Sequence, residues 1–245
     1  MRITVIAPVI LQGPRPPSVL AFAAAARPGC QVEVVFLDRG PASIESEFEE
    51  ALAVPDTIVK ALAAEAGGSD AVILDCMLDP GLEAVREKVA IPVIGPGQTS
   101  MHLAAMLGDR FSIVTVLKSL VPPLRRRARD YGLSARLASV RAIDVPVLDL
   151  ERNRDASVHP LLEQAILAIE HDEADVIVLG CTGMAGLAEA VHNGLVHRGY
   201  PDAPVIDPGL AALKHAEAVV DLKLTHSKRT YPLPPRKALA GYPGM

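Results

Sequence analysis

The chain has 245 residues, half of them hydrophobic, which is enough for one large domain or two smaller lobes that share a core. Its formal net charge of −5 provides no basic field to attract a phosphate backbone, so we expect no nucleic-acid partner. Aromatic residues make up 3% of the chain and tryptophan is absent, so neither a base-stacking surface nor a membrane-interface belt is predicted.

Short runs rich in valine and isoleucine alternate with helix-length segments, which predicts an α/β fold with parallel strands buried on both faces. The predicted strands cover residues 2–7, 31–37, 71–75, 92–95, 111–116, 136–140, 175–180 and 204–207. Prolines in the first turn mark the starts of several helices, among them Pro55 and Pro208. The predicted helices cover residues 17–26, 55–67, 80–89, 98–108, 121–131, 156–172, 183–194 and 208–223.

Three stretches have no regular pattern. The loop 40–46 is polar and follows a strand, and ligands of α/β sheets bind at the carboxyl ends of strands. Ser43 and Ile44 are therefore candidate substrate contacts, with plain turn formation as the alternative. Residues 144–157 form either a lid or a connector. Residues 226–245 are rich in proline and basic side chains, and we expect a tail that wraps the body or a partner subunit.

The first apolar run does not resemble a targeting segment. Residues 3–11 are interrupted by Pro8 and followed by a proline-rich turn, so the run is too short for a signal peptide or a spanning helix. The cysteines at positions 30, 76 and 181 are widely spaced, which is typical of thiols in a reducing compartment. The sequence therefore predicts a cytoplasmic protein that does not contact a membrane.

The two halves of the sequence carry matching motifs around two of the cysteines. Leu74-Asp75-Cys76 closes one apolar run, Leu179-Gly180-Cys181 closes another, and a Gly-Leu pair begins five residues after each cysteine. The match continues downstream, where Pro-Val-Ile-Gly-Pro-Gly at 92–97 corresponds to Pro-Val-Ile-Asp-Pro-Gly at 204–209. A longer loop before the second copy accounts for the difference in spacing.

Such a repeat predicts two similar Rossmann-like lobes related by a pseudo-twofold axis, each with a mostly parallel sheet flanked by helices. We assign residues 1–100 and about 208–225 to lobe 1, which carries Cys76, and residues 101–207 to lobe 2, which carries Cys181. Both cysteines then lie at the carboxyl end of a strand and the start of a helix. They would face each other across the cleft between the lobes.

A thiol in that position can act in proton transfer. The helix dipole and the unpaired N–H groups of the first turn favour the thiolate. Racemisation needs a base on one face of a carbon acid and an acid on the other, and a thiolate and thiol supply both without a metal or pyridoxal phosphate. Backbone N–H groups after the cysteines would stabilise the oxyanion. A cysteine at the end of a strand can also be a packed hydrophobe, which is what we expect of Cys30 because it has no counterpart.

These motifs resemble those of the Asp/Glu/hydantoin racemase superfamily, and within it the hydantoin and allantoin racemase branch. The resemblance is carried by DCMLDPGL at 75–82, FSIVT at 111–115 and VLGCTGM at 178–184, and it covers nearly the whole chain. It implies two pseudo-symmetric lobes, no cofactor, a homo-oligomer and two-base racemisation by Cys76 and Cys181.

The same resemblance implies that substrate is bound by backbone amides and hydroxyls beside the cysteines. In this sequence these groups belong to Met77, Thr182 and Gly183. Thr115, at the end of a strand, either reaches the cleft as well or packs within its sheet.

Two departures from the family pattern bear on the substrate. Relatives often have an asparagine after the first strand, whereas this chain has Ile-Ala-Pro-Val-Ile at 6–10. Relatives often carry an acidic residue after the Pro-Val-Ile-Gly segment, whereas this chain has Gln98-Thr99. Both changes remove hydrogen-bonding groups that a substrate would have to replace, so specificity does not follow from the resemblance.

Other signals do not predict a site. His192 and His197 lack the spacing of metal ligands, and no Gly-x-Gly-x-x-Gly follows the first strand, so neither a metal nor a nucleotide cofactor is expected. Asp75 and Asp79 flank Cys76, and the aspartate that precedes Pro80 either caps the following helix or orients the thiol. The arginines at 125–127 are expected on a solvated helix face.

Three functions compete at this point. The leading one is racemisation of a small cyclic ureide, a 5-substituted hydantoin or allantoin, whose C5 proton is acidified by the neighbouring carbonyl. The second is another reaction of the superfamily, such as amino-acid racemisation, malonate decarboxylation or cis–trans isomerisation; decarboxylation typically uses one cysteine, so the pair favours racemisation. The third is a non-catalytic accessory protein that retains the fold.

Overall fold

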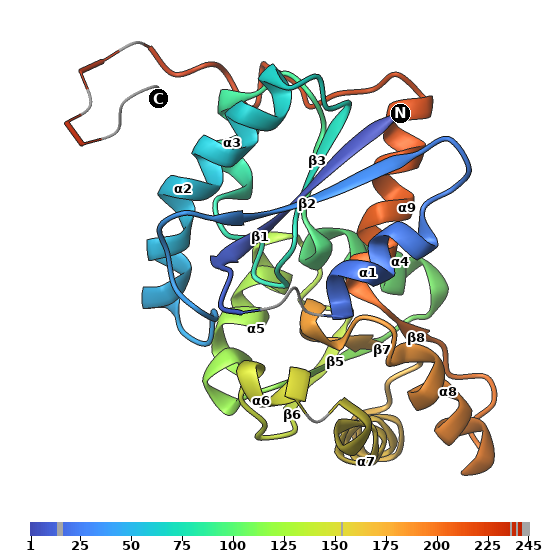
Figure 1. Ribbon diagram of the computed structural model, residues 1–245. Helices are drawn as coiled ribbons and strands as arrows, with labels where there is room; N and C mark the ends of the chain where they lie inside the picture. Colours follow the sequence, from blue (N-terminus) through green and yellow to red (C-terminus); the bar gives the residue numbers. More distant parts are fainter. Residues whose placement is uncertain (14–16, 153, 236, 239, 242–245) are drawn as a thin grey trace.

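The computed structural model describes residues 1–13, 17–152, 154–235, 237–238 and 240–241. Its strands form two four-stranded sheets in which every neighbouring pair is parallel. The strand order is β2-β1-β3-β4 in the first sheet and β6-β5-β7-β8 in the second, so the two halves repeat one order (Figure 1). The predicted α/β fold with two parallel sheets is confirmed.

The strands form where the valine and isoleucine runs predict them. They are β1 (Arg2–Ile10), β2 (Gln31–Leu37), β3 (Ala71–Leu74), β4 (Val93–Ile94), β5 (Phe111–Thr115), β6 (Leu137–Ala142), β7 (Val176–Leu179) and β8 (Val205–Ile206). β3 and β7, which lead to the two cysteines, are buried along their whole length, as expected of strands covered on both faces. Their registers match, because Ile6 pairs with Leu74 in one sheet and Val114 pairs with Leu179 in the other.

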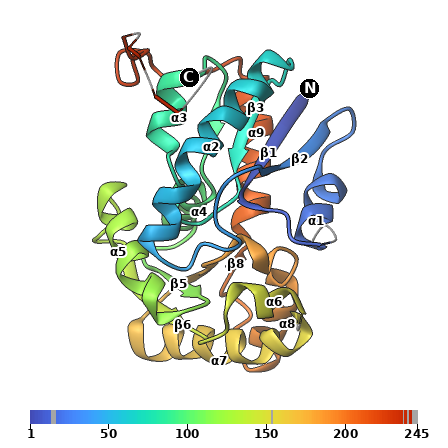
Figure 2. The ribbon, with the colours of Figure 1, turned by 60° about the vertical axis from the view of Figure 1, so that its left-hand side comes forward.

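Two of the helices pack against the sheet of the opposite half of the chain. They are α1 (Pro17–Ala25), α2 (Glu47–Ala66), α3 (Leu82–Lys88), α4 (Pro96–Leu107), α5 (Val121–Asp130), α6 (Val147–Arg152), α7 (Arg154–Asp172), α8 (Ala188–His197) and α9 (Pro208–Asp221), with the 3-10 helices η1 (Lys118–Leu120) and η2 (Thr182–Met184). α4 follows the first sheet but packs against β5 and β7, and α9 follows the second sheet but packs against β3 and β4. α4 and α9 also contact each other, and they join the two halves (Figure 2).

This packing gives the two halves a shared core. One cluster of buried side chains includes Leu74 from the first sheet together with Ile113 and Leu179 from the second. A smaller cluster fills the other face of the first sheet, where Ile73 lies near Leu213 of α9. Burying a side chain of this size stabilises the fold by about 1.5–3 kcal/mol, so the shared cluster holds the two sheets in a fixed relation.

α2 begins eight residues earlier than predicted, at Glu47 instead of position 55. The cause is an N-terminal cap: the Ser46 hydroxyl accepts a hydrogen bond from the Glu49 N–H, and the Glu49 carboxylate accepts from the N–H of Glu45, the residue before the cap. Pro55 therefore lies inside the helix rather than in its first turn. The loop 40–46 ends at this cap.

The stretch 144–157 is largely helical, which corrects the expectation of an irregular segment. It contains α6 and the first turn of α7, and only position 153 lies outside the described residues. The apolar side chain of Leu150 anchors α6 because it is fully buried. A six-residue helix is too short for a periodic pattern to reveal it.

The described part of the C-terminal segment packs on the first half. The Val93 N–H donates to Nε2 of His226 at 2.8 Å, and the Lys228 ammonium donates to the Arg86 carbonyl at 2.7 Å. The Arg86 guanidinium in turn stacks on the Tyr231 ring. Residues 226–231 therefore pack against the body of their own chain. Among all the residues that the structure describes, no helix combines the length and apolarity required to cross a bilayer.

Candidate active site

Equivalent hydrogen bonds build the two cysteine turns. At the end of β3 the Asp75 N–H donates to the Ile6 carbonyl at 2.8 Å, and at the end of β7 the Gly180 N–H donates to the Val114 carbonyl at 2.7 Å. Each bond holds the chain to the central strand of its sheet for one residue beyond the ladder. The backbone therefore enters Cys76 and Cys181 in the same way at the ends of their two strands.

Each cysteine then begins a tight turn. The Cys76 carbonyl accepts from the Asp79 N–H at 3.0 Å, and the Cys181 carbonyl accepts from the Met184 N–H at 3.1 Å. A glycine with a positive φ follows at the fifth residue after each cysteine, at +72° and +82°. L-residues with a side chain rarely adopt that conformation, which explains the matched glycines of the sequence repeat.

The α-helices begin later than the sequence predicts. α3 starts at Leu82 and α8 at Ala188, so neither Cys76 nor Cys181 lies at the N-terminus of an α-helix. Cys181 precedes only the one-turn η2. The expectation that a helix dipole activates both thiols is therefore wrong, and their ionisation depends on their immediate surroundings.

The two turns face one cavity of about 140 Å³. An apolar cavity of about 150 Å³ is large enough for benzene, so this space fits a ring of five or six atoms. The lining residues come from both halves and are mostly apolar: Ala7, Pro8, Val9, Ile10, Leu11, Gln12, Phe36, Ala42, Ser43, Ile44, Asp75, Cys76, Val147, Leu148, Cys181, Thr182 and Gly183.

Six of the eight predicted site residues line this cavity. Both cysteines do, and so do Ser43, Ile44, Thr182 and Gly183. Met77 and Thr115 do not. The Met77 side chain lies in the core, where its sulfur accepts a hydrogen bond from the Ser100 hydroxyl at 3.7 Å.

Thr115 is fully buried, and its hydroxyl donates to the Gly180 carbonyl at 3.1 Å. A Cβ on Gly180 would lie 2.7 Å from the Thr115 Cβ, so the threonine fills the space that the glycine leaves. Of the two sequence interpretations of Thr115, packing within the sheet is the one that the structure supports.

Sequence reasoning missed the walls of the cavity. The end of β1 and the residues after it, positions 7–12, line one side, and Val147 and Leu148 of α6 line another. The signal for the first wall was present, because β1 is a central strand and ligands bind beyond the carboxyl ends of such strands. No comparable signal marked α6.

The family profile described as Asp/Glu/Hydantoin racemase matches residues 18–216. The chain belongs to this family. A hydantoin racemase from Pseudomonas sp. (strain NS671) is 39% identical over 222 residues, which are 90% of this chain and 87% of that protein.

Two solved structures extend the likeness to almost the whole chain. The allantoin racemase from Klebsiella pneumoniae is 36% identical with a TM-score of 0.89, and the alignment covers 98% of this chain and 96% of that one. The allantoin racemase from Pseudomonas fluorescens is 35% identical with a TM-score of 0.90, covering 98% and 100%.

A hydrogen bond between the halves joins the two turns of this family member. The Thr182 hydroxyl donates to the Asp75 carbonyl at 3.0 Å, so the residue after one cysteine is tied to the residue before the other. The bond holds the two turns next to each other. It gives Thr182 a structural role besides its position on the cavity wall.

The surroundings of Cys76 keep its thiol protonated. Burial raises the pKa of Cys76 well above its usual value, and a hydrogen bond from the Leu78 N–H only partly opposes this. The nearby Cys181 and the carboxyl groups of Glu50 and Asp79 raise that pKa further because they disfavour a second negative charge. These groups therefore favour the protonated thiol of Cys76 at neutral pH.

Asp79 ties the Cys76 turn to the rest of the molecule. Its carboxylate is fully buried and accepts from the N–H groups of Gly97 and Gln98 at 2.9 and 2.7 Å, and from the Tyr131 hydroxyl at 2.6 Å. Asp79 thus caps α4 and not the helix that follows it in sequence. Burial raises its pKa to about 6, although all three hydrogen bonds favour the carboxylate.

The Cys181 turn is held by a carboxylate that comes from outside it. Asp207, at the start of α9, accepts from the Gly186 N–H at 2.8 Å and from the Leu210 N–H at 3.1 Å. Arg154 adds a second tie, because its guanidinium donates to the Gly183 carbonyl at 2.8 Å and also to the Ala185 carbonyl. Each turn is therefore fixed by several hydrogen bonds before a substrate binds.

Across the described ranges, no group of three or more histidine, cysteine or acidic side chains has the arrangement of a metal site. His192 and His197 each bond a backbone carbonyl of their surroundings, that of Ala203 for His192 and that of Asn193 for His197. The chemistry of the cavity therefore has to be derived from its thiols, its hydroxyls and its backbone N–H groups.

Proposed function

We propose that this chain is a cofactor-independent racemase that inverts the C5 centre of a 5-substituted hydantoin by two-base proton transfer between Cys76 and Cys181. The observation that carries the proposal is the presence of both sulfurs on the wall of one ring-sized cavity. The membership of the chain in the Asp/Glu/hydantoin racemase family supports it independently.

The proposed reaction balances without any external reagent. In one direction the Cys181 thiolate removes the C5 proton, and the electron pair of the C–H bond moves into an enolate on the neighbouring carbonyl. The Cys76 thiol then donates its proton to the opposite face of C5. The inverted product leaves the enzyme with Cys181 protonated and Cys76 as the thiolate, which is the form that catalyses the reverse direction.

The enolate oxygen needs hydrogen-bond donors that are already in place. The backbone N–H groups of Thr182 and Gly183 follow Cys181 on the cavity wall, and the Ser43 hydroxyl lies on the wall as well. For Met77 we retain only the backbone N–H as a candidate donor, because its side chain is buried in the core. Removing one such donor typically lowers kcat by about 10²–10³-fold.

The cavity lining favours a substrate with an apolar substituent. Most of its side chains are aliphatic or aromatic, including Phe36, Ile44 and Leu148. Allantoin carries a polar ureido group at the same carbon and is the second candidate, because the solved relatives are named allantoin racemases. A polar substituent would have to pair with Gln12 or Asp75 to avoid an uncompensated loss of hydration.

The test is racemisation in D₂O of resolved 5-methyl-, 5-isobutyl- and 5-benzylhydantoin and of resolved allantoin. We expect the wild type to lose optical rotation while C5 gains deuterium, and Cys76→Ser or Cys181→Ser to stop racemisation. Cys30→Ser is the matched control, because this half-buried thiol lies outside the cavity and its loss should leave the rate unchanged. Deuterium exchange that persists in the double variant Cys76→Ser/Cys181→Ser would contradict the proposal.

The remaining expectations concern organisation and location. We propose that residues 1–100 with about 208–225 form one lobe, that residues 101–207 form the other, and that residues 226–245 are an appended tail. We also propose a cytoplasmic homo-oligomer that acts on a small molecule. Gel filtration with light scattering tests the oligomer, and a monomer at micromolar concentration would contradict it.

A further inference from the structure

α6 is held at both of its ends. At the N-terminal end, the Val147 N–H donates to the Glu45 carboxylate at 2.6 Å, which links α6 to the loop before α2. Towards the other end, the Leu150 side chain is fully buried. It lies beside the Cys181 turn, because a Cβ built on Gly183 would be 3.4 Å from the Leu150 Cδ2 atom. α6 therefore lies between the loop of the first half and the Cys181 turn of the second.

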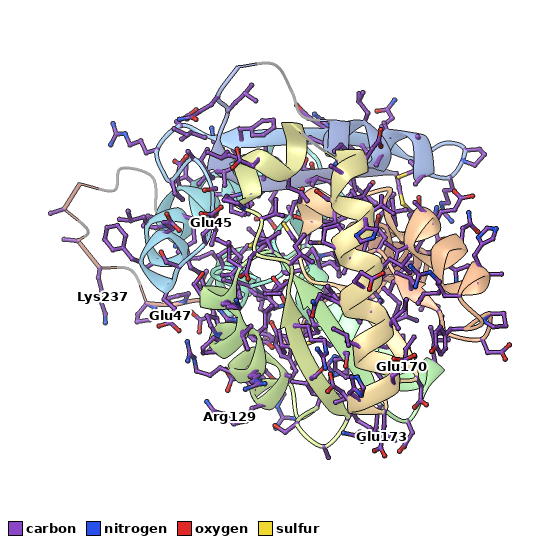
Figure 3. The ribbon with its side chains drawn as sticks, turned by 90° about the horizontal axis from the view of Figure 1, so that it is seen from below. Glu45, Glu47, Arg129, Glu170, Glu173 and Lys237 are labelled. Carbon is purple, nitrogen blue, oxygen red and sulfur yellow. The ribbon has the colours of Figure 1, made fainter. Side chains whose placement is uncertain are left out.

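Glu45 has several bonds that fix its own position. Its N–H donates to the Glu49 carboxylate at 2.7 Å as part of the α2 cap, and its carbonyl accepts from the Ser119 hydroxyl at 3.0 Å. Ser43 and Ile44, immediately before it, line the cavity. In Figure 3 the labelled Glu45 lies between α2 and α6. The carboxylate that bonds Val147 is thus presented by a segment that is already rigid.

The wall of the cavity that α6 forms is apolar. Val147 and Leu148 are the α6 residues in the lining, and Phe36 lines the cavity from the first half. If C5 lies between the two sulfurs, the hydantoin ring and the C5 substituent both point away from the line that joins the sulfurs. The ureide ring requires polar partners, which Ser43 and Thr182 provide, so the substituent is left to the apolar side chains.

We propose that Val147 and Leu148 form the wall that contacts the C5 substituent, and that Glu45 is a positioning residue that holds this wall in place. The inference rests on the proposed hydantoin racemase activity and specifies its substrate class as hydantoins with a compact apolar C5 group. Specificity then resides in α6, whereas the proton transfer resides in the cysteine turns.

The experiment measures kcat and KM for 5-methyl- and 5-benzylhydantoin in Leu148→Ala, Glu45→Ala and Glu45→Gln. Leu148→Ala should raise the ratio of kcat/KM for benzyl over methyl by about tenfold or more, because hydrophobic pockets discriminate by about 10–200-fold per methylene group. Glu45→Ala should raise KM for both substrates by about tenfold with little change in kcat, since it removes a hydrogen bond to a charged group. Glu45→Gln keeps an oxygen acceptor and should recover part of the loss.

Two matched controls separate the wall from general stability. Glu47→Ala removes a neighbouring carboxylate that also pairs across the halves, with Arg126, but does not touch the cavity. Leu107→Ala removes an exposed leucine that lies outside the lining. Both variants should behave like the wild type.

Deuterium exchange at C5 of unsubstituted hydantoin distinguishes the two levels of the proposal, because this substrate has no substituent to contact the wall. Wild-type exchange with an unchanged benzyl-to-methyl ratio in Leu148→Ala overturns the specificity wall and leaves the racemase intact. Loss of that exchange in Leu148→Ala also overturns it, because α6 would then act on the thiols. A wild type that exchanges none of these hydantoins overturns the proposed function itself.

Discussion

The turn after Cys76 and the turn after Cys181 follow one backbone pattern, but different groups hold them. The Cys76 turn carries its own buried carboxylate, Asp79, which receives three hydrogen bonds. The Cys181 turn carries no acidic side chain in the equivalent place, where Met184 stands, and is held by Asp207 from α9.

This difference gives two thiols in similar positions unequal surroundings. Burial opposes the ionisation of the Cys76 thiol, and the charges of Cys181, Glu50 and Asp79 oppose it further. A racemase that uses two thiols needs one of them protonated and the other ionised at the start of each turnover. The repeated backbone brings the two sulfurs to one cavity, and the groups around Cys76 favour its protonated form.

The largest expected effect comes from a matched pair of glycines at the starts of α4 and α9. A Cβ on Gly97 would lie 2.3 Å from the Met77 carbonyl oxygen, a backbone atom of the Cys76 turn. A Cβ on Gly209 would meet nothing closer than the Phe22 ring at 3.1 Å. Gly97→Ala should therefore lower the free energy of unfolding by about 3 kcal/mol or more and reduce activity, whereas Gly209→Ala should cost about 1 kcal/mol or less.

Urea unfolding and the racemisation rate of the two variants measure this contrast. Equal losses in both would mean that the Cys76 turn is no more tightly packed than its counterpart.

The next effect concerns the pH dependence that Asp79 contributes. Its pKa is about 6 in the folded chain, above the usual value near 4, so folding favours its protonated form. The contribution of Asp79 to stability is therefore greatest below about pH 4 and falls as the pH rises through 6. At about 1.4 kcal/mol per pKa unit, the change amounts to about 3 kcal/mol.

Asp79→Asn removes this titration and leaves the other acidic groups in place. The free energy of unfolding of the wild type, relative to the variant, should increase when the pH is lowered from about 7.5 to about 4.5. Urea unfolding at both pH values measures the difference. A constant difference would contradict the raised pKa of Asp79.

The smallest expected effect is that of Tyr131→Phe, which removes only one of the three hydrogen bonds to Asp79. The free energy of unfolding at neutral pH should fall by about 1.5–3 kcal/mol if the bond to the charged carboxylate has its usual strength. The pKa of Asp79 should rise further, because the hydroxyl favours the carboxylate. Chemical denaturation across pH detects both changes, and a shift of the Asp79 titration to lower pH would contradict them.

The sequence predicted the elements that depend on local pattern. The valine and isoleucine runs marked the strands, and the matched Leu-x-Cys and Gly-Leu motifs identified the two turns because their glycines adopt positive φ in both copies. The prediction failed where the local pattern is too short or ambiguous. α6 is too short to show a period, and Pro55 does not start a helix because the Ser46 cap lies upstream of it.

The sequence also predicted only part of the candidate site. Cys76 and Cys181 follow from the repeat, and Thr182 and Gly183 follow from the family resemblance. In contrast, the Met77 side chain lies in the core, and Thr115 fills the space beside a glycine. The ionisation of Cys76 depends on Glu50, which lies far from it in sequence, and on burial by both halves. The helix-dipole argument from the sequence predicts a lowered pKa for Cys76, whereas its surroundings raise that pKa.

Proton exchange from single enantiomers by the single-cysteine variants tests the central claim most directly. Two sulfurs on opposite faces of C5 require that Cys76→Ala exchange the C5 proton of one hydantoin enantiomer for deuterium and that Cys181→Ala exchange that of the other. Exchange of the same enantiomer by both variants, or continued exchange when both sulfurs are removed, would contradict it.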